Sequence, residues 1–351
     1  MNGKYHIIGI MSGTSLDGID IVKCCFQEED KWRYWIESPK TIPYTNSWKR
    51  KLQNLHQKSK SEIKDTDIKY GELLSKIILD YINKYNIKCD YIASHGHTIF
   101  HDPKIGSTLQ IGDGQTIYNS TNITTINNFR ELDILRGGQG APLVPVGDLL
   151  LFPNYKYCLN LGGFANISIK NEKIIAFDIC AVNFILNFLT RKINKDYDDK
   201  GEISRSGEIN KNLFEELNSI SFFKKPHPKS LSREWADKEI IPMLEKYHIP
   251  LNNKLSTFCE HIAFQIGKFL KNNSVLVTGG GVHNKYLIER IKYYSKCKII
   301  IPDNNIINFK EAIIFAFLGV LRITNKINCF SSVTGAKRDS SSGDIYKNNS
   351  S

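Results

Sequence analysis

The chain has 351 residues, of which 41% are hydrophobic, and a formal net charge of +11. Its length predicts two domains, while apolar runs such as residues 312–320 fall short of the roughly 20 residues of a membrane span. The lysines are spread along the chain instead of forming one block, which argues against a nucleic-acid partner but suits an anionic ligand.

The N-terminus and the cysteines indicate where the protein works. No basic region followed by a long apolar segment opens the chain, so we expect neither a signal peptide nor a membrane partner. Eight cysteines lie mainly in apolar segments, and none forms a Cys-x-x-Cys pair. This pattern predicts reduced core thiols in a cytoplasmic protein.

The first half of the chain predicts a meander of strands followed by alternating helices and strands. Period-2 and helical patterns predict strands at 6–11, 19–26 and 32–38, a helix at 68–85, strands at 91–94 and 123–126, and a glycine-rich connection at 136–142.

The second half opens in the same way. We predict strands at 157–161, 166–170, 173–177, 274–278 and 298–301, helices at 183–192, 213–219, 255–270, from 284 and at 310–324, and a frayed tail after residue 340. The parallel between the halves predicts an internal structural duplication, an α/β fold with mixed sheets, and a ligand cleft between the halves.

A turn of small polar residues, GIMSGTSLDGID at 9–20, joins the first two predicted strands. It matches neither the Walker loop nor Gly-x-Gly-x-x-Gly. Its glycines let main-chain N–H groups surround a phosphate, helped by the hydroxyls of Ser12, Thr14 and Ser15. Asp17 or Asp20 would suit Mg²⁺, directly or through water. The alternative is an ordinary hairpin with a polar surface.

Two further turns are rich in glycine. Gly162 and Gly163 follow a strand in LGGFAN (161–166), and three glycines join a strand to a helix in VTGGGVHN (277–284). Adenine is flat, so it would lie well against such bare backbone.

The motifs together resemble those of the anhydro-N-acetylmuramic acid kinase family, in the superfamily of sugar kinases, Hsp70 and actin. The resemblance runs through nearly the whole chain, at residues 9–20, 94–98, 109–112, 128–130, 137–142, 160–163, 279–284, 311–312 and 333–336.

The resemblance implies a fold and a reaction. The fold is α/β, a two-domain actin-like, Hsp70-like (ribonuclease H-like) ATPase with a central cleft, which we divide into a first lobe (1–143 and 312–351) and a second lobe (144–311). The reaction uses ATP and water to open 1,6-anhydro-N-acetylmuramic acid and phosphorylate O6, giving N-acetylmuramic acid 6-phosphate for cell-wall recycling. The family also implies ATP, Mg²⁺ and the sugar as ligands, and a homodimer.

The resemblance assigns the water-activating base to Asp178. The family segment Asp-Thr-Gly-Pro-Gly-Asn corresponds here to Asp178-Ile-Cys-Ala-Val-Asn183, so four residues differ between a retained aspartate and a retained asparagine. An aspartate at the end of an apolar strand would also be partly desolvated, which raises its basicity. The alternative is a carboxylate that caps the helix starting near Asn183.

Other roles follow from the same resemblance. Glu311 would act on the sugar or, alternatively, stabilise a helix N-terminus. Arg130 would bind the lactyl carboxylate or form a structural ion pair, and His95 would orient the sugar or be a satisfied buried histidine. The expected ATP-binding residues are Gly13, Thr14, Ser15, Leu16, Asp17, Gly18, Ile19, Asp20, Gly162, Gly163, Gly279, Gly280, Gly281 and Asn284, with Asn183 beside the sugar.

Two other classes of function are open to the sequence. His95, His97 and His101, with Asp102, form His-x-His-x-x-x-His-Asp after a predicted strand, a pattern similar to a metallohydrolase ligand set, and His97 replaces the Gln usual in the family. A nucleotide-binding protein without transfer activity is the other alternative.

Overall fold

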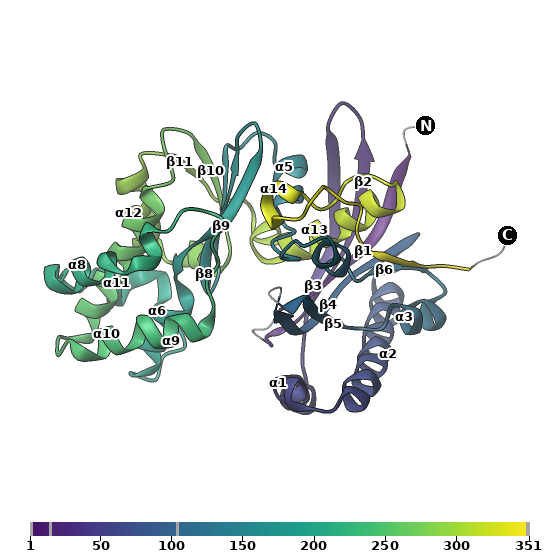
Figure 1. Ribbon diagram of the computed structural model, residues 1–351, viewed down its shortest axis with the longest axis horizontal. Coiled ribbons are helices and arrows are strands. Elements are labelled where there is room, and N and C mark those ends of the chain that lie inside the picture. Colours follow the sequence, from purple (N-terminus) through teal and green to yellow (C-terminus); the bar gives the residue numbers. More distant parts are fainter. Residues whose placement is uncertain (1–2, 14–15, 103–104, 349–351) are drawn as a thin grey trace. The chain divides into compact units, whose positions relative to one another are not determined.

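The computed structural model describes residues 3–13, 16–102 and 105–348, and the chain forms two compact units (Figure 1). Unit 1 comprises Met1–Phe152 and Phe309–Ser351, and unit 2 comprises Pro153–Asn308. Unit 1 therefore includes residues 144–152 and 309–311, which we assigned to the second lobe from the sequence.

Unit 1 is built on a sheet whose described strands number seven, in the order β12-β6-β4-β1-β2-β3 with β5 paired to β4. Strands β1, β2 and β3 are antiparallel, whereas β4 runs parallel to both β1 and β6. The elements are β1 (Lys4–Ser12), β2 (Gly18–Glu28), β3 (Trp32–Pro43), α1 (Asn46–Asn54), α2 (Lys60–Tyr85), β4 (Tyr91–Asp102), β5 (Ser107–Ile111), α3 (Gly114–Thr121), β6 (Thr124–Asn127), α4 (Glu131–Leu135), α5 (Pro145–Leu151), α13 (Asn304–Ile323, whose first residues belong to unit 2), α14 (Ser331–Thr334) and β12 (Asp344–Tyr346).

Strand β1 is buried on both faces because helices cover both sides of the sheet. Ile8 and Ile10 join the cluster that includes Leu74 of α2. Gly9 points to the other face, where a Cβ atom would lie 2.2 Å from the carbonyl oxygen of Ala312 in α13. A side chain at residue 9 would therefore push α13 away from the sheet.

Unit 2 repeats this architecture with different residues. Its described strands form a sheet of five, in the order β11-β10-β7-β8-β9, in which β7, β8 and β9 are antiparallel and β10 is parallel to β7 and β11. The elements are β7 (Tyr157–Leu161), β8 (Phe164–Lys170), β9 (Ile174–Ala181), α6 (Asn183–Arg191), α7 (Glu202–Arg205), α8 (Lys211–Ser219), α9 (Arg233–Glu239), α10 (Ile241–Lys246), α11 (Leu251–Gly267), β10 (Ser274–Thr278), α12 (Lys285–Ser295) and β11 (Lys298–Ile300).

The two sheets confirm the predicted α/β class and the internal duplication. The order β3-β2-β1-β4-β6 in unit 1 corresponds to β9-β8-β7-β10-β11 in unit 2, with the same strand directions. Each unit thus contains an antiparallel meander, and parallel strands extend the sheet beside the first strand of that meander. This repeated arrangement is expected for the actin-like and Hsp70-like class.

Several expected bounds are wrong. The helix predicted at 68–85 begins at Lys60, and the strand predicted at 32–38 continues to Pro43. Residues 344–346 are not frayed but form β12, which pairs with β6. Strand β4 does not end at residue 94 but continues to Asp102. Strand β9 continues past Asp178 to Ala181, with a register shift beside it. Pairing with β5 and β8 extends β4 and β9 beyond their predicted ends, and pairing with β6 orders residues 344–346.

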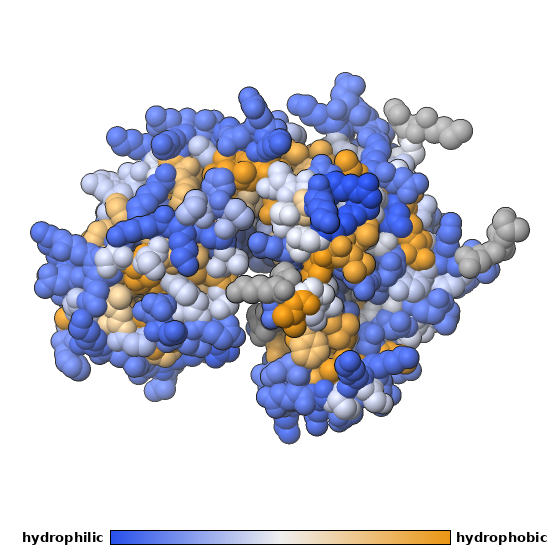
Figure 2. Space-filling view, viewed as in Figure 1, coloured by the Kyte–Doolittle hydropathy of each residue, from blue (hydrophilic) through white to orange (hydrophobic). Residues whose placement is uncertain are grey.

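The surface and the thiols agree with a chain whose apolar residues fill two cores. The face seen in Figure 2 is mostly hydrophilic, with smaller hydrophobic patches. All eight cysteines are free and all but Cys89 are buried, as expected for core thiols. Among the residues that the structure describes, no helix combines the length and the apolar character needed to cross a membrane.

Candidate active site

The turn between β1 and β2 is shorter than the sequence suggested. Thr14 and Ser15, expected to bind phosphate, lie outside the described residues. Leu16 adopts φ = 60° and its amide donates to the carbonyl of Gly13 at 3.3 Å. Gly18, Ile19 and Asp20 already belong to β2. A Cβ atom on Gly18 would lie 2.7 Å from the carbonyl oxygen of Ile42, so this glycine serves the pairing with β3.

Two carboxylates lie at the C-terminal side of this turn, Asp17 within it and Asp20 in β2. Asp20 accepts a hydrogen bond of 2.6 Å from the hydroxyl of Thr41. Desolvation raises the pKa of Asp20, and the nearby charge of Asp17 raises it further against the effect of Thr41. A carboxylate whose proton affinity is raised by a neighbouring carboxylate marks a site where a divalent cation would relieve repulsion, and Mg²⁺ in kinases is typically held by one or two carboxylates plus phosphate. The pair therefore fits Mg²⁺.

The three histidines of β4 do not form a metal site. His95 bonds the carbonyl of Gly96 through Nδ1 (2.9 Å) and accepts from Arg130 at Nε2, while Nδ1 of His101 lies 3.1 Å from the hydroxyl of Thr108. Nδ1 of His97 lies 2.8 Å from the hydroxyl of Ser12. Among the described residues no three His, Cys, Asp or Glu side chains are grouped to hold a metal. The metallohydrolase hypothesis is therefore not favoured.

Arg130 and Glu311 interact within unit 1. Arg130 donates to Nε2 of His95 (3.1 Å from Nε and 2.8 Å from Nη2) and to the carbonyl of Gly140 at 2.7 Å. Burial lowers the pKa of Arg130 to about 10, against the attraction of Glu311. Desolvation raises the pKa of Glu311, although its side chain retains exposed surface, and Lys310 and Arg130 act in the opposite direction. Glu311 lies inside α13, so it does not stabilise the N-terminus of this helix.

Asp178 lies in unit 2 and is only partly exposed. Its amide donates to the carbonyl of Lys229 at 3.0 Å, and its Oδ2 accepts from the amide of Leu231 at 2.8 Å. Desolvation raises the pKa of Asp178 to about 6, although the Leu231 hydrogen bond acts to lower it. No side chain caps α6, so the capping alternative for Asp178 is wrong. A carboxylate of this kind is suited to accept a proton near neutral pH.

The glycine-rich turns of unit 2 lie at adjacent strand ends. Strand β10 pairs with β7 so that Thr278 is opposite Asn160, which brings the two turns that follow together. Asn183 donates from Nδ2 to the carbonyl of Leu161 at 3.0 Å. Asn284 caps α12 by accepting from the amide of Leu287.

Gly279 and Gly280 differ in the room around them. Gly279 has φ = 84°, and a Cβ atom there would lie 2.5 Å from Oδ1 of Asn160. At Gly280 the nearest atom to a Cβ would be Nδ2 of Asn183, at 3.7 Å. Gly279 is thus needed for the backbone itself, whereas Gly280 leaves open space beside it, as a ligand surface requires.

Residues missed by the sequence analysis include Lys229, Leu231 and Arg233. They follow the aromatic pair Phe222–Phe223 and lie beside Phe177, Asp178 and Phe184. Only the run KSLSRE at 229–234, polar and rich in turn-forming serine, could have marked them.

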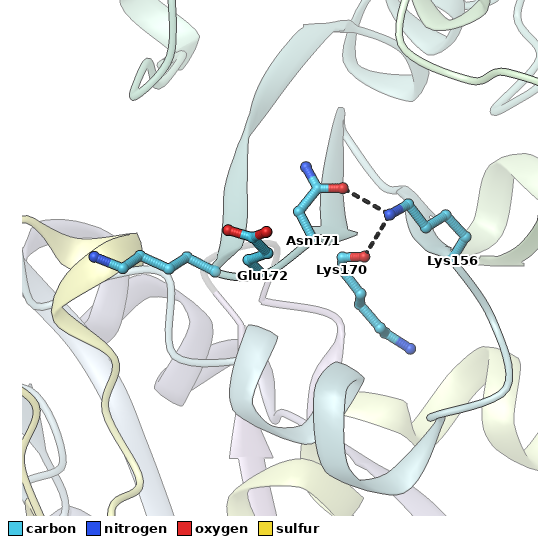
Figure 3. A pocket seen from close by; sticks show the side chains of 5 residues that line it. Lys156, Lys170, Asn171 and Glu172 are labelled. Atoms are coloured by element: carbon cyan, nitrogen blue, oxygen red, sulfur yellow. Dashed lines mark hydrogen bonds between the residues drawn. The ribbon is translucent and has the colours of Figure 1, made fainter.

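A separate surface pocket lies at the hairpin between β8 and β9. Lys156 bonds the carbonyl of Lys170 at 2.7 Å and Oδ1 of Asn171 at 2.6 Å, with Glu172 and Lys173 completing the lining (Figure 3). None of the predicted site residues lines it, and solvated lysines alone do not make a binding site.

Comparison with known proteins shows what the whole chain is similar to. The family model described as "Anhydro-N-acetylmuramic acid kinase" matches residues 5–348. Proteins of that name from Bacillus cereus, Sulfurovum sp. and Crocosphaera subtropica are 31%, 32% and 34% identical to the chain. The matches cover 97%, 98% and 97% of this chain and 98%, 99% and 98% of those proteins.

Proposed function

Since the chain belongs to the anhydro-N-acetylmuramic acid kinase family, we propose that it uses ATP and water to convert 1,6-anhydro-N-acetylmuramic acid to N-acetylmuramic acid 6-phosphate. Water adds to C1 of the sugar as the bond between C1 and O6 breaks. The released O6 takes the γ-phosphoryl group of ATP, and ADP leaves.

The observation that carries this proposal is the burial and hydrogen bonding of the Asp178 carboxylate. Its carboxylate is desolvated enough to raise its pKa to about 6, yet hydrogen-bonded through Oδ2 alone among the described residues. Such a group is ionised at pH 7 and retains an oxygen to accept a proton. We assign it the role of general base, which takes a proton from the attacking water.

The turn between β1 and β2 would bind the phosphates of ATP. Its main-chain amides and small residues, Gly13 among them, provide donors without a lysine. Asp17 and Asp20 would hold Mg²⁺, directly or through water. When bound, the ion neutralises charge on the β- and γ-phosphates.

Unit 2 would contribute the adenosine surface. The open space at Gly280 and the neighbouring Gly281 allow a flat base to approach the backbone, while Gly162, Gly163, Gly279 and Asn284 shape the two turns.

The sugar would be bound by charged and polar side chains. Arg130, desolvated and already oriented by His95 and Gly140, suits the lactyl carboxylate of the substrate. Glu311 would accept hydrogen bonds from sugar hydroxyls, and Asn183 would contact the sugar beside the base. In this assignment His95 acts by orienting Arg130.

The proposal extends to location and assembly. We expect a cytoplasmic homodimer whose partners are ATP and the sugar, with no nucleic acid or membrane involved. Sedimentation equilibrium of the purified chain tests the dimer, and fractionation of cells tests the location.

Isotope labelling tests the reaction itself. The purified protein is incubated with ATP, Mg²⁺ and the anhydro sugar in ¹⁸O-labelled water, and the product is analysed by mass spectrometry. We expect one phosphate and one ¹⁸O at C1 of the product, and no ATP consumption without the sugar. A product lacking either addition would contradict the coupled reaction, and a protein that binds ATP but consumes none with the sugar would be a nucleotide-binding protein.

A further inference from the structure

A short segment of unit 2 lies along the residues around Asp178. This segment, Lys229–Arg233, contacts the strand β9 side at Phe177 and Asp178 and the helix α6 side at Phe184. Leu231, whose amide bonds the carboxylate of Asp178, is 53 residues from Asp178 in the chain.

The segment bonds Asp178 twice. The carbonyl of Lys229 accepts from the amide of Asp178 at 3.0 Å. Two residues later the amide of Leu231 donates to Oδ2 at 2.8 Å. The backbone of Asp178 and its carboxylate are thus held by one stretch of chain, while no described residue bonds Oδ1.

Lys229 anchors the first end of the segment. Its ammonium lies 4.8 Å from the ring centre of Phe222, 5.6 Å from that of Phe269 and 6.0 Å from that of Phe177. It also donates to the carbonyl of Phe222 at 3.4 Å. Cation–π contacts with several rings stabilise a partly desolvated ammonium, so Lys229 is held in place although desolvation lowers its pKa.

Arg233 anchors the second end. Its guanidinium lies 5.4 Å from the ring centre of Phe184, which stacks on Phe164 of β8 with centroids 5.9 Å apart. Ser232 caps α9 by accepting from the amide of Trp235. The amide of Leu231 therefore lies between the ring contacts of Lys229 and the cap of α9.

We propose that Lys229 is a positioning residue for Asp178. Its ring-bound ammonium fixes the segment so that the Leu231 amide binds Oδ2, which leaves Oδ1 as the atom that receives the proton of the attacking water. The inference rests on the proposed function. In the step, one O–H bond of water breaks, its proton forms a bond to Oδ1, and the remaining hydroxide oxygen bonds C1 as O6 leaves.

The titratable groups near Asp178 include Cys180, Lys229 and His227. Cys180 lies two residues after Asp178 in β9, and besides burial the charge of Asp178 raises the pKa of the Cys180 thiol. Besides desolvation, the charge of Lys268, directly after α11, lowers the pKa of Lys229, and Cys180 acts in the opposite direction. His227 stacks on Phe177 with ring centroids 5.4 Å apart. Burial raises the pKa of the Cys180 thiol, which keeps it protonated at neutral pH.

The test compares Lys229→Met with Lys229→Arg and with Lys192→Met. Met retains the aliphatic stem and loses the cation, whereas Arg retains a cation for the rings. Lys192 is a matched control, because its ammonium lies 4.7 Å from the ring centre of Phe188 and pairs with Glu245 away from Asp178. Two quantities are measured: the pH dependence of kcat/KM, and the titration of the Asp178 carboxyl by ¹³C NMR, with the signal assigned by its loss in Asp178→Asn.

Positioning predicts a specific pattern. A weakened hydrogen bond from Leu231 should raise the pKa of Asp178 in Lys229→Met by about one unit, a tenfold change in its acid dissociation constant. We expect kcat to fall about tenfold, since a hydrogen bond to a charged group is worth that much, while KM for the sugar changes little. Lys229→Arg should restore most of kcat, and Lys192→Met should match the wild type in both measurements.

Two outcomes would overturn the inference: an Asp178 titration unchanged in Lys229→Met, or a loss of activity in that variant that comes only from less folded protein. Leu231→Pro, which deletes the donor itself, gives a second measurement, and an unchanged Asp178 pKa in the folded variant would also refute it. The NMR titration needs no turnover, so it separates this inference from the proposed function. If the wild type were inactive but the Asp178 titration still shifted in Lys229→Met, only the proposed function would be contradicted.

Discussion

The hydroxyl of Ser12 lies 2.8 Å from Nδ1 of His97. This hydrogen bond joins the last residue of β1 to β4, directly before the turn proposed to bind phosphate. The same hydroxyl lies 2.5 Å from that of Tyr44, which in turn lies 2.5 Å from that of Tyr70. Burial lowers the pKa of His97 to about 4, so the ring is neutral at pH 7. Every hydroxyl finds an acceptor when Tyr70 donates to Tyr44, Tyr44 to Ser12 and Ser12 to His97.

The first prediction concerns this buried chain. His97→Leu removes its final acceptor and leaves a buried hydroxyl unpaired, so the free energy of unfolding should fall by about 1–3 kcal/mol. His97→Gln supplies an amide oxygen in place of Nδ1 and should lose less than half as much. Urea unfolding of both variants measures the difference. Equal stability of the two would mean that the hydrogen bond to Ser12 contributes little.

The second prediction concerns the proposed base. Asp178→Asn retains an acceptor for the Leu231 amide but cannot take a proton at neutral pH. We expect kcat to fall by about 10²–10⁴-fold, with ATP affinity within about twofold of the wild type because the nucleotide does not depend on this charge. Steady-state kinetics and calorimetric titration of ATP measure both. Near-normal turnover would remove Asp178 from the mechanism.

The third prediction is the pH dependence of stability caused by the same residue. Its pKa rises from 3.8 to about 6 on folding, so holding the charge destabilises the folded state. This cost is absent below pH 3.8, accumulates as the pH rises to about 6, and is complete above it. Asp178→Asn should therefore be more stable than the wild type by roughly 1–3 kcal/mol at pH 8, and the gain should vanish near pH 4.

Denaturant unfolding at pH 4, 6 and 8 measures this difference. A gain of the same size at all three values would show that it does not arise from ionisation of Asp178. Activity should report the same group, with kcat/KM falling as the pH drops below about 6 because the base becomes protonated.

The fourth prediction separates two neighbouring glycines. Gly279→Ala places a methyl group 2.5 Å from Oδ1 of Asn160 at φ = 84°, so the protein should lose about 1–3 kcal/mol of stability. Gly280→Ala has room for its methyl group and should leave stability within about 0.5 kcal/mol. The methyl group would occupy the proposed adenosine surface, so ATP affinity should fall about tenfold or more. Unchanged ATP affinity in Gly280→Ala would mean that adenine binds elsewhere.

The fifth prediction concerns the C-terminal strand. A stop codon after Gly343 removes β12, which pairs with β6 from Thr125 to Asn127, and removes Tyr346, which packs against Gly114. Loss of a partly buried aromatic ring and its strand should lower the free energy of unfolding by about 2 kcal/mol. Thermal unfolding of the truncated and full chains checks this, and equal melting temperatures would show that the strand is dispensable.

Strands with a continuous apolar run were predictable from the sequence. Strands β7 and β10 have the predicted bounds, because both are buried on both faces and a glycine directly follows each of them. The extension of β4 past Ser94 was not predictable, because pairing with β5 compensates for its polar residues. Residues 344–346, too few to form an apolar run, likewise become a strand because β6 offers an edge to pair with.

The candidate site divides in the same way. Its glycines could be chosen from local motifs, and the family resemblance implied Asp178 and Arg130 through short stretches of consecutive residues. The hydrogen bond from Leu231 to Asp178 could not, because it joins residues 53 apart that no periodicity relates.

By itself, the sequence determined the family, the α/β class and the repeated order of elements, because burial patterns and glycine spacing are local properties that each segment carries alone. Only the tertiary structure decided that His97 bonds Ser12 rather than a metal and that Leu231 holds one oxygen of Asp178. Such partners are chosen by packing between distant segments, since a buried donor or acceptor must be satisfied by whichever group the fold brings beside it.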